Sequence, residues 1–393
     1  DVKTAKAALF PSLSFSTSQQ VVNRPYQETS SRVSGSEIIS SNSKTSYNGN
    51  YGLNASWTLY NGNKRLKTIQ QEKLNNQVAE LDVATSENNI QESIAQVYIQ
   101  ILYAAESVKV NESTLQVSIA QRDRGQELLN AGSIAKSDFA QLEAQVSTDR
   151  YQLVTAQATL EDYKLQLKQL LELDGENEMN IYLPALSDEN VLAPLPTKKD
   201  VYISALSLRP EIEASKLNVE ASELGIGIAK SSYLPTISLS AGIGTNHTSG
   251  SDFTFGEQVK NGWNNSIGLS VSVPIFNNRQ TKSAVQKAKL QYETSMLSLL
   301  DEQKTLYKTI EGLWLDANSA QQRYAAANEK LKSTQISYEL ISEQFNLGMK
   351  NTIELLTEKN NLLQAQQEQL QAKYMAILNT QLLKFYQGDQ LAL

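Results

Sequence analysis

The chain has 393 residues, a formal net charge of −7, one histidine and no cysteine. Without cysteine it has no disulfides, thiolate metal sites or cysteine nucleophiles. Its one histidine, His247, leaves histidine zinc sites and Ser-His-Asp triads close to excluded. A negative charge without a basic stripe argues against a nucleic-acid partner. This composition therefore argues against histidine- and cysteine-based catalysis and metal binding.

Membrane-spanning helices are not expected, because no run of about eighteen residues is apolar. A transmembrane strand is compatible with the sequence, since it needs only about ten residues with every second one apolar. The chain has no initiator methionine and no signal peptide, which predicts a mature or trimmed form. Residues 2–9 match only the end of a helix that is longer in the second half. We therefore expect about one helix to be missing before them.

Two strands are predicted in the first half, at about residues 11–21 and 47–60. Leu13 and Phe15 alternate with serines in the first strand, and the second strand shows the same alternation. A period of two places the apolar side chains on one face and the polar ones on the other. The segment between the strands, residues 22–46, is rich in Ser, Asn and charge and is predicted as a solvated loop.

A long helical hairpin is predicted next, at about residues 63–173. Its first helix, to about Leu129, contains no proline and only one glycine. At about 1.5 Å per residue, this helix spans on the order of 100 Å. Apolar residues recur at every seventh position, which indicates packing at coiled-coil angles. Members of this seam in the two helices are Ile94, Ile101, Val108, Leu115, Val146, Leu153, Leu160 and Leu167.

The second half follows a connector at residues 175–200, which is predicted as irregular because it contains Pro184, Pro194 and Pro196. Residues 246–262, rich in Gly, Asn and Thr, are predicted as a loop that includes His247. The other elements expected here are a helix at about 200–232, strands at about 235–246 and 264–276, and a helical hairpin at about 279–387, with seam residues Leu356, Leu363, Leu370 and Ile377.

An internal repeat relates the two halves. The segment Trp57–Gly62 aligns with Val273–Asn278 at an offset of 216, and this offset continues without a gap to about Asp174. A constant register over that length is hard to obtain by chance, so we predict a two-fold repeat. The predicted domains are a first repeat at 1–174, an equatorial connector at 175–200 and a second repeat at 201–393.

The alternating strands fit two environments. A half-buried sheet on a soluble core gives the same alternation, and the strands alone favour that interpretation. Two features favour a membrane instead, namely strands long enough to cross a bilayer and aromatic residues at their ends. Four strands cannot close a barrel, and an open sheet edge cannot sit in lipid, so insertion requires several copies. The predicted interface aromatics are Phe10, Tyr47, Tyr51, Trp57, Tyr60, Trp263 and Phe276.

The order of strand pair, long hairpin and connector, then the same again, resembles the TolC family of outer-membrane efflux proteins. The match covers the whole chain. The more specific residues are Phe10–Leu13 and Leu234–Ile237 before the strands, and Leu208–Ile212, which is similar to the family's Arg-Pro-acidic signature. Each hairpin turn also carries a glycine followed six residues later by an acidic residue. The family's Ala-Gln pair is kept at Ala144-Gln145 but not at Asn360-Asn361.

The resemblance implies a mixed α and β membrane protein in the bacterial outer membrane that extends into the periplasm. It implies a homotrimer, with a twelve-stranded transmembrane β-barrel continued by a coiled-coil tube of twelve helices. Its function would be a passive exit duct of a tripartite efflux or secretion system, without catalysis, cofactor or metal. Its partners would be outer-membrane lipid, a periplasmic adaptor (membrane fusion) protein and an inner-membrane pump of RND or ABC type.

Two other classes stay open. A structural or adhesive coiled-coil outer-membrane protein without a conducting pore explains the seven-residue repeat, but it does not explain four membrane-type strands. An enzyme on a helical scaffold would have to use carboxylate pairs such as Asp301-Glu302. No histidine, cysteine or glycine-rich phosphate loop lies near that pair. The exported substrate is not indicated by the sequence.

The hairpin turns are the adaptor-docking tips that the resemblance implies. They lie far from the strands along the chain, and the second one presents an apolar pair that favours a partner. The alternative role for the glycines is simply to end the helices. The predicted docking residues are Ala131, Gly132, Ser133, Leu347, Gly348 and Met349.

The periplasmic aperture is expected close to these tips. Glu354 matches the first position of an acidic ring found in some family members, and Thr357 stands at the second, where it breaks a doubled ring. In a trimer, three close Glu354 carboxylates would raise one another's pKa and attract cations. A solvated glutamate near a helix N-terminus is the alternative. Asp138 is the counterpart of Glu354 in the first half. Phe345 matches a residue that holds the tip closed in relatives, although it also continues the seam.

Overall fold

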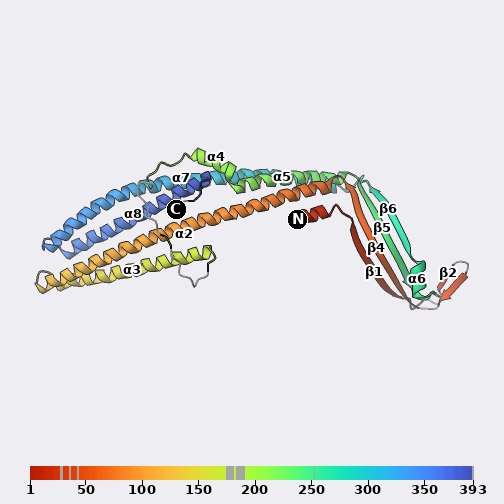
Figure 1. Cartoon of the computed structure of the whole chain (residues 1–393), viewed down its shortest axis with the longest axis horizontal. Coiled ribbons are helices and arrows are strands. Elements are labelled where there is room, and N and C mark those ends of the chain that lie inside the picture. Colours follow the sequence, from red (N-terminus) through yellow and green to blue (C-terminus); the bar gives the residue numbers. More distant parts are fainter. Residues whose placement is uncertain are drawn as a thin grey trace. The chain divides into compact units, whose positions relative to one another are not determined.

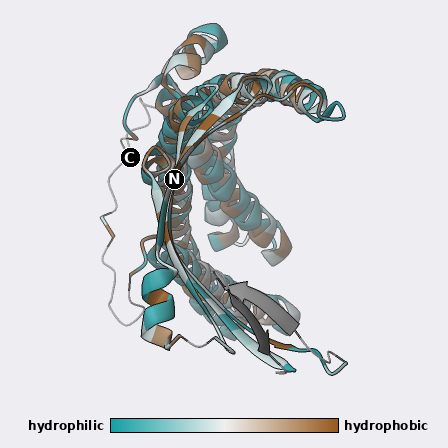
Figure 2. Cartoon of the chain, turned by 90° about the vertical axis from the view of Figure 1, so that its right-hand side faces the viewer, coloured by the Kyte–Doolittle hydropathy of each residue, from teal (hydrophilic) through white to brown (hydrophobic). Residues whose placement is uncertain are grey.

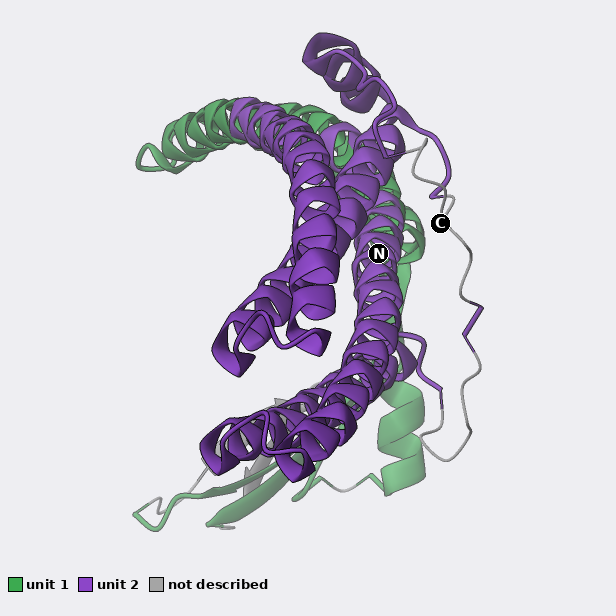
Figure 3. Cartoon of the chain, turned by 90° about the vertical axis from the view of Figure 1, so that its left-hand side faces the viewer, with its two compact units in different colours: residues 1–80, 214–299 green, residues 81–213, 300–393 purple. Residues whose placement is uncertain are grey.

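The computed structural model describes residues 1–26, 30–34, 37–41, 44–173, 181–182, 191–251 and 253–391. The protein is mixed α and β, mostly helical with a four-stranded sheet. It divides into two compact units (Figure 3). Unit 1 contains residues 1–80 and 214–299, and unit 2 contains residues 81–213 and 300–393. Each unit therefore combines segments from both predicted repeats.

The sheet of unit 1 is antiparallel, with the strand order β1-β4-β5-β6 (Figure 1). Its strands are β1 (Ser12–Asn23), β4 (Thr45–Asn61), β5 (Thr236–Thr248) and β6 (Asn264–Ser272). The register pairs Phe15 with Leu53, Leu53 with Ile243, and Leu239 with Leu269. Paired residues point to the same face, so the apolar sets of all four strands share one face. These are Leu13, Phe15, Leu53, Ala55, Trp57, Leu239, Ala241, Ile243, Ile267, Leu269 and Val271.

The opposite face of the sheet is small and polar, because the intervening residues pair in the same way. The serines there also donate across strands, as when the Ser12 hydroxyl bonds the Ser56 carbonyl. None of these side chains is charged. The members of this face are Ser14, Ser16, Gly52, Asn54, Ser56, Ser238, Ser240, Gly242, Gly244, Ser266 and Ser270.

The predicted loop at 22–46 is partly wrong, because β1 and β4 extend into it and a strand pair lies within it. This pair is β2 (Ser30–Ser34) and β3 (Glu37–Ser41), joined as an antiparallel hairpin. The sequence of the pair contains Val33, Ile38 and Ile39, whose β-branched side chains favour strands. Residues 27–29, 35–36 and 42–43 lie outside the described residues.

The second predicted loop, at 246–262, is also partly wrong. Strand β5 continues to Thr248, so His247 is a strand residue, and α6 (Phe255–Asn261) follows. Helix α6 begins with a capping box, in which the backbone N–H of Glu257 donates to the Thr254 hydroxyl and the Thr254 N–H donates to the Glu257 carboxylate. Strand β6 ends at Ser272, earlier than predicted, since Pro274 has no N–H to donate.

Four long helices carry the hairpins: α2 (Lys64–Asn130), α3 (Lys136–Leu170), α7 (Gln280–Asn346) and α8 (Thr352–Gln387). In unit 2 their seams bury an apolar core that includes Leu102, Tyr324, Ala376, Ile377 and Leu382. None of the described helices is apolar enough over a sufficient length to span a bilayer.

The predicted helix at 200–232 is divided at Pro210. Helix α4 (Lys198–Leu208) is followed by its C-cap residue Arg209, which is extended at φ −75° and ψ 124°, and α5 (Pro210–Lys230) begins next. Proline lacks an N–H and disfavours a helical conformation in the residue before it, which accounts for the break. A 3₁₀ turn, η2 (Ser231–Tyr233), follows α5.

Of the predicted connector, Pro184 lies outside the described residues, whereas 191–197 are described and irregular. This stretch is held on α7. The Trp314 indole donates to the Pro196 carbonyl at 3.0 Å, and the Gln321 amide donates to the Val191 and Ala193 carbonyls at 3.0 and 2.8 Å. The short N-terminal helix α1 (Val2–Ala7) precedes β1, and the Trp57 indole donates to the Leu9 carbonyl beside it.

Candidate functional site

The two hairpin turns of unit 2 share one backbone geometry. Gly132 donates to the Leu129 carbonyl and Ser133 to the Leu128 carbonyl, while Gly348 and Met349 make the equivalent bonds to Phe345 and Gln344. Both glycines have φ +72°. This is the Schellman arrangement that ends a helix on a left-handed residue, which glycine adopts without strain. The capping role of the two glycines is therefore present in the structure.

The side chains at both turns are exposed. Ala131, Gly132 and Ser133 form a small, nearly featureless first turn. The second turn presents two large apolar side chains, with Leu347 74% and Met349 70% exposed. An apolar pair at the end of a hairpin has no partner within its own turn, so the second tip offers the stronger contact surface.

Glu354 belongs to the first turn of α8. Its backbone N–H donates to the Asn351 side chain at 2.9 Å, and its carboxylate accepts from the Asn351 N–H at 3.2 Å and from the Lys350 ammonium at 2.5 Å. The bond from Lys350, followed by that from Asn351, holds the pKa of Glu354 below its ordinary value. In a single chain this carboxylate therefore caps a helix and is charged at neutral pH. The raised pKa expected of three close copies is a property of the assembled ring and stays a prediction.

The other predicted aperture residues are in different environments. Asp138 repeats half of the capping box, because its carboxylate accepts from the Ala135 N–H at 3.4 Å. Thr357 is exposed, and its hydroxyl donates to the Ile353 carbonyl of its own helix. Phe345 is buried to 3% exposure, which accords with packing in the seam.

A buried ionic cluster, which sequence reasoning missed, joins the two hairpins. Lys359 of α8 donates to Asp149 of α3 and to Ser118 of α2, and the Ser118 hydroxyl donates to Asp149 at 2.5 Å. The side chains of Lys359 and Asp149 are only 3% and 1% exposed. Burial lowers the pKa of the Lys359 ammonium, and the Asp149 carboxylate opposes that effect. The sequence does contain a sign of this cluster. Ser118, Asp149 and Lys359 each lie three residues after a predicted seam residue (Leu115, Val146 and Leu356), which places them beside the seam on the same side of the helix.

The Arg-Pro-acidic signature has a structural role. Arg209 is 6% exposed, and its guanidinium donates to Glu211 at 2.8 Å and to Glu92 of α2 at 3.2 Å. It also lies 4.2 Å from the ring centroid of Tyr386 in α8. Burial and, secondarily, the Glu92 charge raise the pKa of Tyr386 to about 12. The motif therefore ties the α4–α5 break to α2 and α8.

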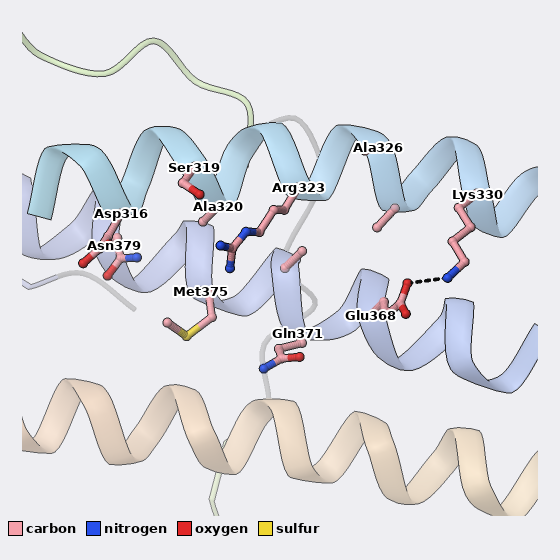
Figure 4. A pocket seen from close by; sticks show the side chains of 12 residues that line it. Asp316, Ser319, Ala320, Arg323, Ala326, Lys330, Glu368, Gln371, Met375 and Asn379 are labelled. Carbon is pink, nitrogen blue, oxygen red and sulfur yellow. Dashed lines mark hydrogen bonds and ion pairs between the residues drawn. The ribbon is translucent and has the colours of Figure 1, made fainter.

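A groove of about 550 Å³ lies between α7 and α8. Its lining includes small residues such as Ala320 and Ala372. At one side, Lys330 and Glu368 form an ion pair of 2.7 Å (Figure 4). This lining is typical of a helix-packing surface, with no pairing of a nucleophile and a base. Within the described part of the chain, no group of three or more His, Cys, Asp or Glu residues could hold a metal ion.

The apolar face of the sheet in unit 1 is exposed, with Ile267 reaching 79%. Aromatic residues stand at both ends of β4 on this face. Tyr47 and Trp57 are ten residues apart, about 33 Å along a strand at about 3.3 Å per residue. A strand tilt of about 40° reduces this to about 25 Å, the height of the apolar band of outer-membrane barrels. A β-bulge between Thr58 and Tyr60 also brings Tyr60 opposite Ile237, on the face of Trp57.

Of the remaining predicted aromatics, Tyr51 lies within β4, four residues after Tyr47 and six before Trp57, so it is not at a strand end. Trp263 directly precedes β6. Phe10 precedes β1, and Phe276 follows β6 at the end nearer α2. Phe10, Trp263 and Phe276 are exposed. Their role as a membrane girdle stays a prediction.

A sheet with one exposed apolar face, joined along the chain to long helical hairpins, fits the class of outer-membrane channel subunits. The profile of the outer membrane efflux protein family matches residues 1–172 and 201–388. The chain belongs to this family.

Individual relatives are distant. The chain is 24% identical over 294 residues to the outer membrane efflux protein BepC of Brucella suis, covering 74% of this chain and 61% of BepC. It is 23% identical over 311 residues to the outer membrane protein TolC of Escherichia coli, covering 77% of this chain and 62% of TolC. The chain thus spans about three fifths of the length of these relatives. The solved channel CusC superposes with a TM-score of 0.80 at 19% identity, over 99% of this chain and 86% of CusC.

Proposed function

We propose that the chain is one subunit of a passive exit duct in the bacterial outer membrane, working in a tripartite efflux or secretion system. Three copies would form a twelve-stranded barrel and a tube of twelve helices. The energy would come from an inner-membrane pump of RND or ABC type, reached through a periplasmic adaptor. Family membership supports the outer-membrane location and the channel class.

The observation that carries the proposal is the one-sided sheet. Its apolar face is exposed on all four strands, and its edges, β1 and β6, have no partner strand in the described part of the chain. In hydrocarbon every backbone N–H and C=O needs a partner, so an open edge is excluded there. Pairing the β1 edge of one copy with the β6 edge of the next satisfies both edges. Three copies would give twelve strands, an even number like that of other bacterial barrels.

The other face suits an aqueous path. Serine, asparagine and glycine are small and uncharged, so they line a lumen with hydrogen-bonding groups while leaving room for solutes. Since closing the barrel turns one face outward, the apolar face would meet lipid and this polar face would meet water.

We infer that the two hairpins descend from a duplication. Helices α2 and α7 each contain 67 residues, and the first and last residues of α7 stand 216 positions after those of α2. The matching Schellman turns support the same origin. In the assembly, the exposed tips would dock the adaptor, chiefly through Leu347 and Met349. Opening would be a rotation of the second hairpin against its neighbours.

A structural or adhesive role without a pore is the competing function, and conductance distinguishes the two. The purified protein, reconstituted in planar bilayers, should give discrete ion-conducting steps and should have the mass of three chains in detergent. Replacing Glu354→Gln should weaken block by added divalent cations, whereas Glu329→Gln, on the exposed side of α7, should not. A stable trimer that never conducts would favour the structural role. Unchanged cation block in Glu354→Gln would contradict an acidic ring formed by Glu354.

A further inference from the structure

Helix α6 is seated at the end of the sheet farther from α2. The Thr245 hydroxyl of β5 donates to the Val259 carbonyl at 2.7 Å, and the Thr248 N–H donates to the Gln258 side chain at 2.8 Å. The ring of Phe255 meets the His247 ring edge-on, with centroids 5.1 Å apart. These contacts fix both ends of the short helix on β5.

His247 is at the centre of this contact between α6 and β5, which we call the seat of α6 and which consists of Thr245, His247 and Thr248. Its ring stacks at 6.0 Å on Tyr51 of β4 and lies directly over Gly49, where an added Cβ would come within 2.2 Å of the imidazole. The glycine therefore leaves the space that the histidine ring occupies. The Nδ1 atom is buried and has no hydrogen-bond partner, so the described contacts of the ring are made through its faces and edges.

The seat lies on the apolar face of the sheet. His247 and Thr245 continue the alternation of Ile243 along β5, and the register pairs them with Gly49 and Tyr51. The helix thus covers the end of the face that the proposed barrel turns toward lipid. The short helix beside the strands in Figure 2, α6, carries both hydrophobic and hydrophilic residues.

Exposed aromatic rings gather at the two ends of α6, whereas the exposed side chains along the helix itself, such as Glu257 and Lys260, are charged. Phe255 packs one edge on His247 and is still 56% exposed, and Trp263, just after the helix, is 57% exposed. Phe253, just before the helix, is exposed as well. Aromatic rings in such numbers adjoining an apolar surface mark a contact surface rather than scattered exposure. Aromatic side chains also prefer the boundary between headgroups and hydrocarbon.

We propose that α6 is an interfacial helix that lies in the lipid headgroup layer at the outer rim of the barrel. Phe253, Phe255 and Trp263 enter the top of the hydrocarbon, and the exposed Lys260 can extend to the headgroups. The partner is the bilayer surface itself. This inference rests on the proposed function, because it requires that the sheet spans the membrane.

Depth-dependent fluorescence quenching tests the proposal. The three native tryptophans, Trp57, Trp263 and Trp314, are replaced by phenylalanine, and Phe255→Trp provides the single reporter. The whole protein is reconstituted into vesicles of phosphatidylcholine brominated either near the headgroup or near the end of the acyl chain. We expect more loss of fluorescence with the shallow bromines, as for a ring about 5–10 Å into the boundary.

An Ile267→Trp reporter in the same background separates the two levels of inference, since Ile267 lies within β6. If Ile267→Trp is quenched by lipid bromine but Phe255→Trp is quenched only by aqueous iodide, the result supports the membrane-spanning barrel and overturns the interfacial position of α6. Shielding of Phe255→Trp from both quenchers would mean contact with another copy and would also overturn it. If neither reporter is quenched by lipid, the proposed function and the inference both fail.

A matched pair of glycine variants tests the histidine seat. Gly49→Ala places a methyl group in the space of the His247 ring, whereas Gly256→Ala, in α6, has open space around it. We expect Gly49→Ala to reduce lipid quenching of the Phe255→Trp reporter and Gly256→Ala to leave it unchanged. Equal quenching in both variants, with Ile267→Trp still quenched, would remove His247 as the residue that positions α6.

Discussion

At the scale of single residues, the buried contact between the hairpins is polar where the seam predicts apolar packing. Lys359 and Asp149 are each nearly inaccessible, and each is satisfied by the other together with Ser118. Gln145 adds a further donor to Asp149 at 2.9 Å. A buried pair of this kind contributes little net stability compared with apolar residues, but losing one partner leaves a charge without compensation.

Single replacements in this pair are therefore expected to be costly and the double replacement mild. Asp149→Leu or Lys359→Met should each lower the free energy of unfolding by about 3–5 kcal/mol, and the double variant should recover most of that loss. Urea unfolding of the detergent-solubilised protein measures the cycle. The exposed pair Lys330–Glu368 is the control, since Lys330→Met should cost less than about 1 kcal/mol. Additive losses in the double variant would contradict the coupling.

At the scale of elements, the two hairpins differ at their second helices. The N-cap residue of α8 is Asn351, whose side chain caps the helix in a reciprocal box with Glu354. The N-cap residue of α3 is Ala135, which has the extended backbone of an N-cap, φ −77° and ψ 157°, but no side chain to accept a bond. The second hairpin therefore has a complete N-cap and the first hairpin an incomplete one, at equivalent positions 216 residues apart.

This difference predicts opposite effects at the two positions. Asn351→Ala should weaken the first turn of α8 by about 1 kcal/mol, and Ala135→Asn should strengthen the first turn of α3 by a similar amount. Hydrogen exchange of the two turns measures both changes. Because the pKa of Glu354 is lowered in the folded chain, its part of the cap is fully present above the ordinary value of 4.5 and is lost as the pH falls from there through the lowered pKa of the folded chain. A loss of protection on raising the pH would contradict this sign.

At the scale of the whole molecule, the decisive property is that the two faces of the sheet are chemically different. Leu53 and Asn54 are neighbours on β4 and point to opposite faces. Leu53 lies six residues after Tyr47 and four before Trp57, so in the proposed barrel it would meet hydrocarbon near the middle of the bilayer, and Asn54 would meet water. The same added charge should therefore have different consequences at adjacent positions.

Leu53→Lys should destabilise the membrane-inserted protein by about 2–4 kcal/mol, whereas Asn54→Lys should leave insertion nearly unchanged. Urea titration in lipid vesicles, followed by the electrophoretic shift between folded and unfolded forms, measures the first effect. Asn54→Lys should instead move the ion selectivity of the channel toward anions. Equal destabilisation by the two lysines would mean that the sheet is buried in protein on both faces.

The sequence determined the class and order of the main elements, because periods of two and seven are local properties of the chain. It placed the four sheet strands to within a few residues, except at the Pro274 end of β6, and the hairpin turns at their glycines. It was also sufficient to indicate the family. Its weaker points were segments without a period. The β2–β3 pair and α6 lie where only composition could be used, and composition predicted loops.

Only the tertiary structure decided which residues meet across elements. The register aligned four separate apolar sets on one face, and the bulge before Tyr60 placed that side chain with them. The Ser118–Asp149–Lys359 cluster and the seat of His247 bring together residues far apart along the chain. Pairings of this kind depend on how helices and strands pack in three dimensions, and a periodic pattern specifies which face of an element is buried but not its neighbour.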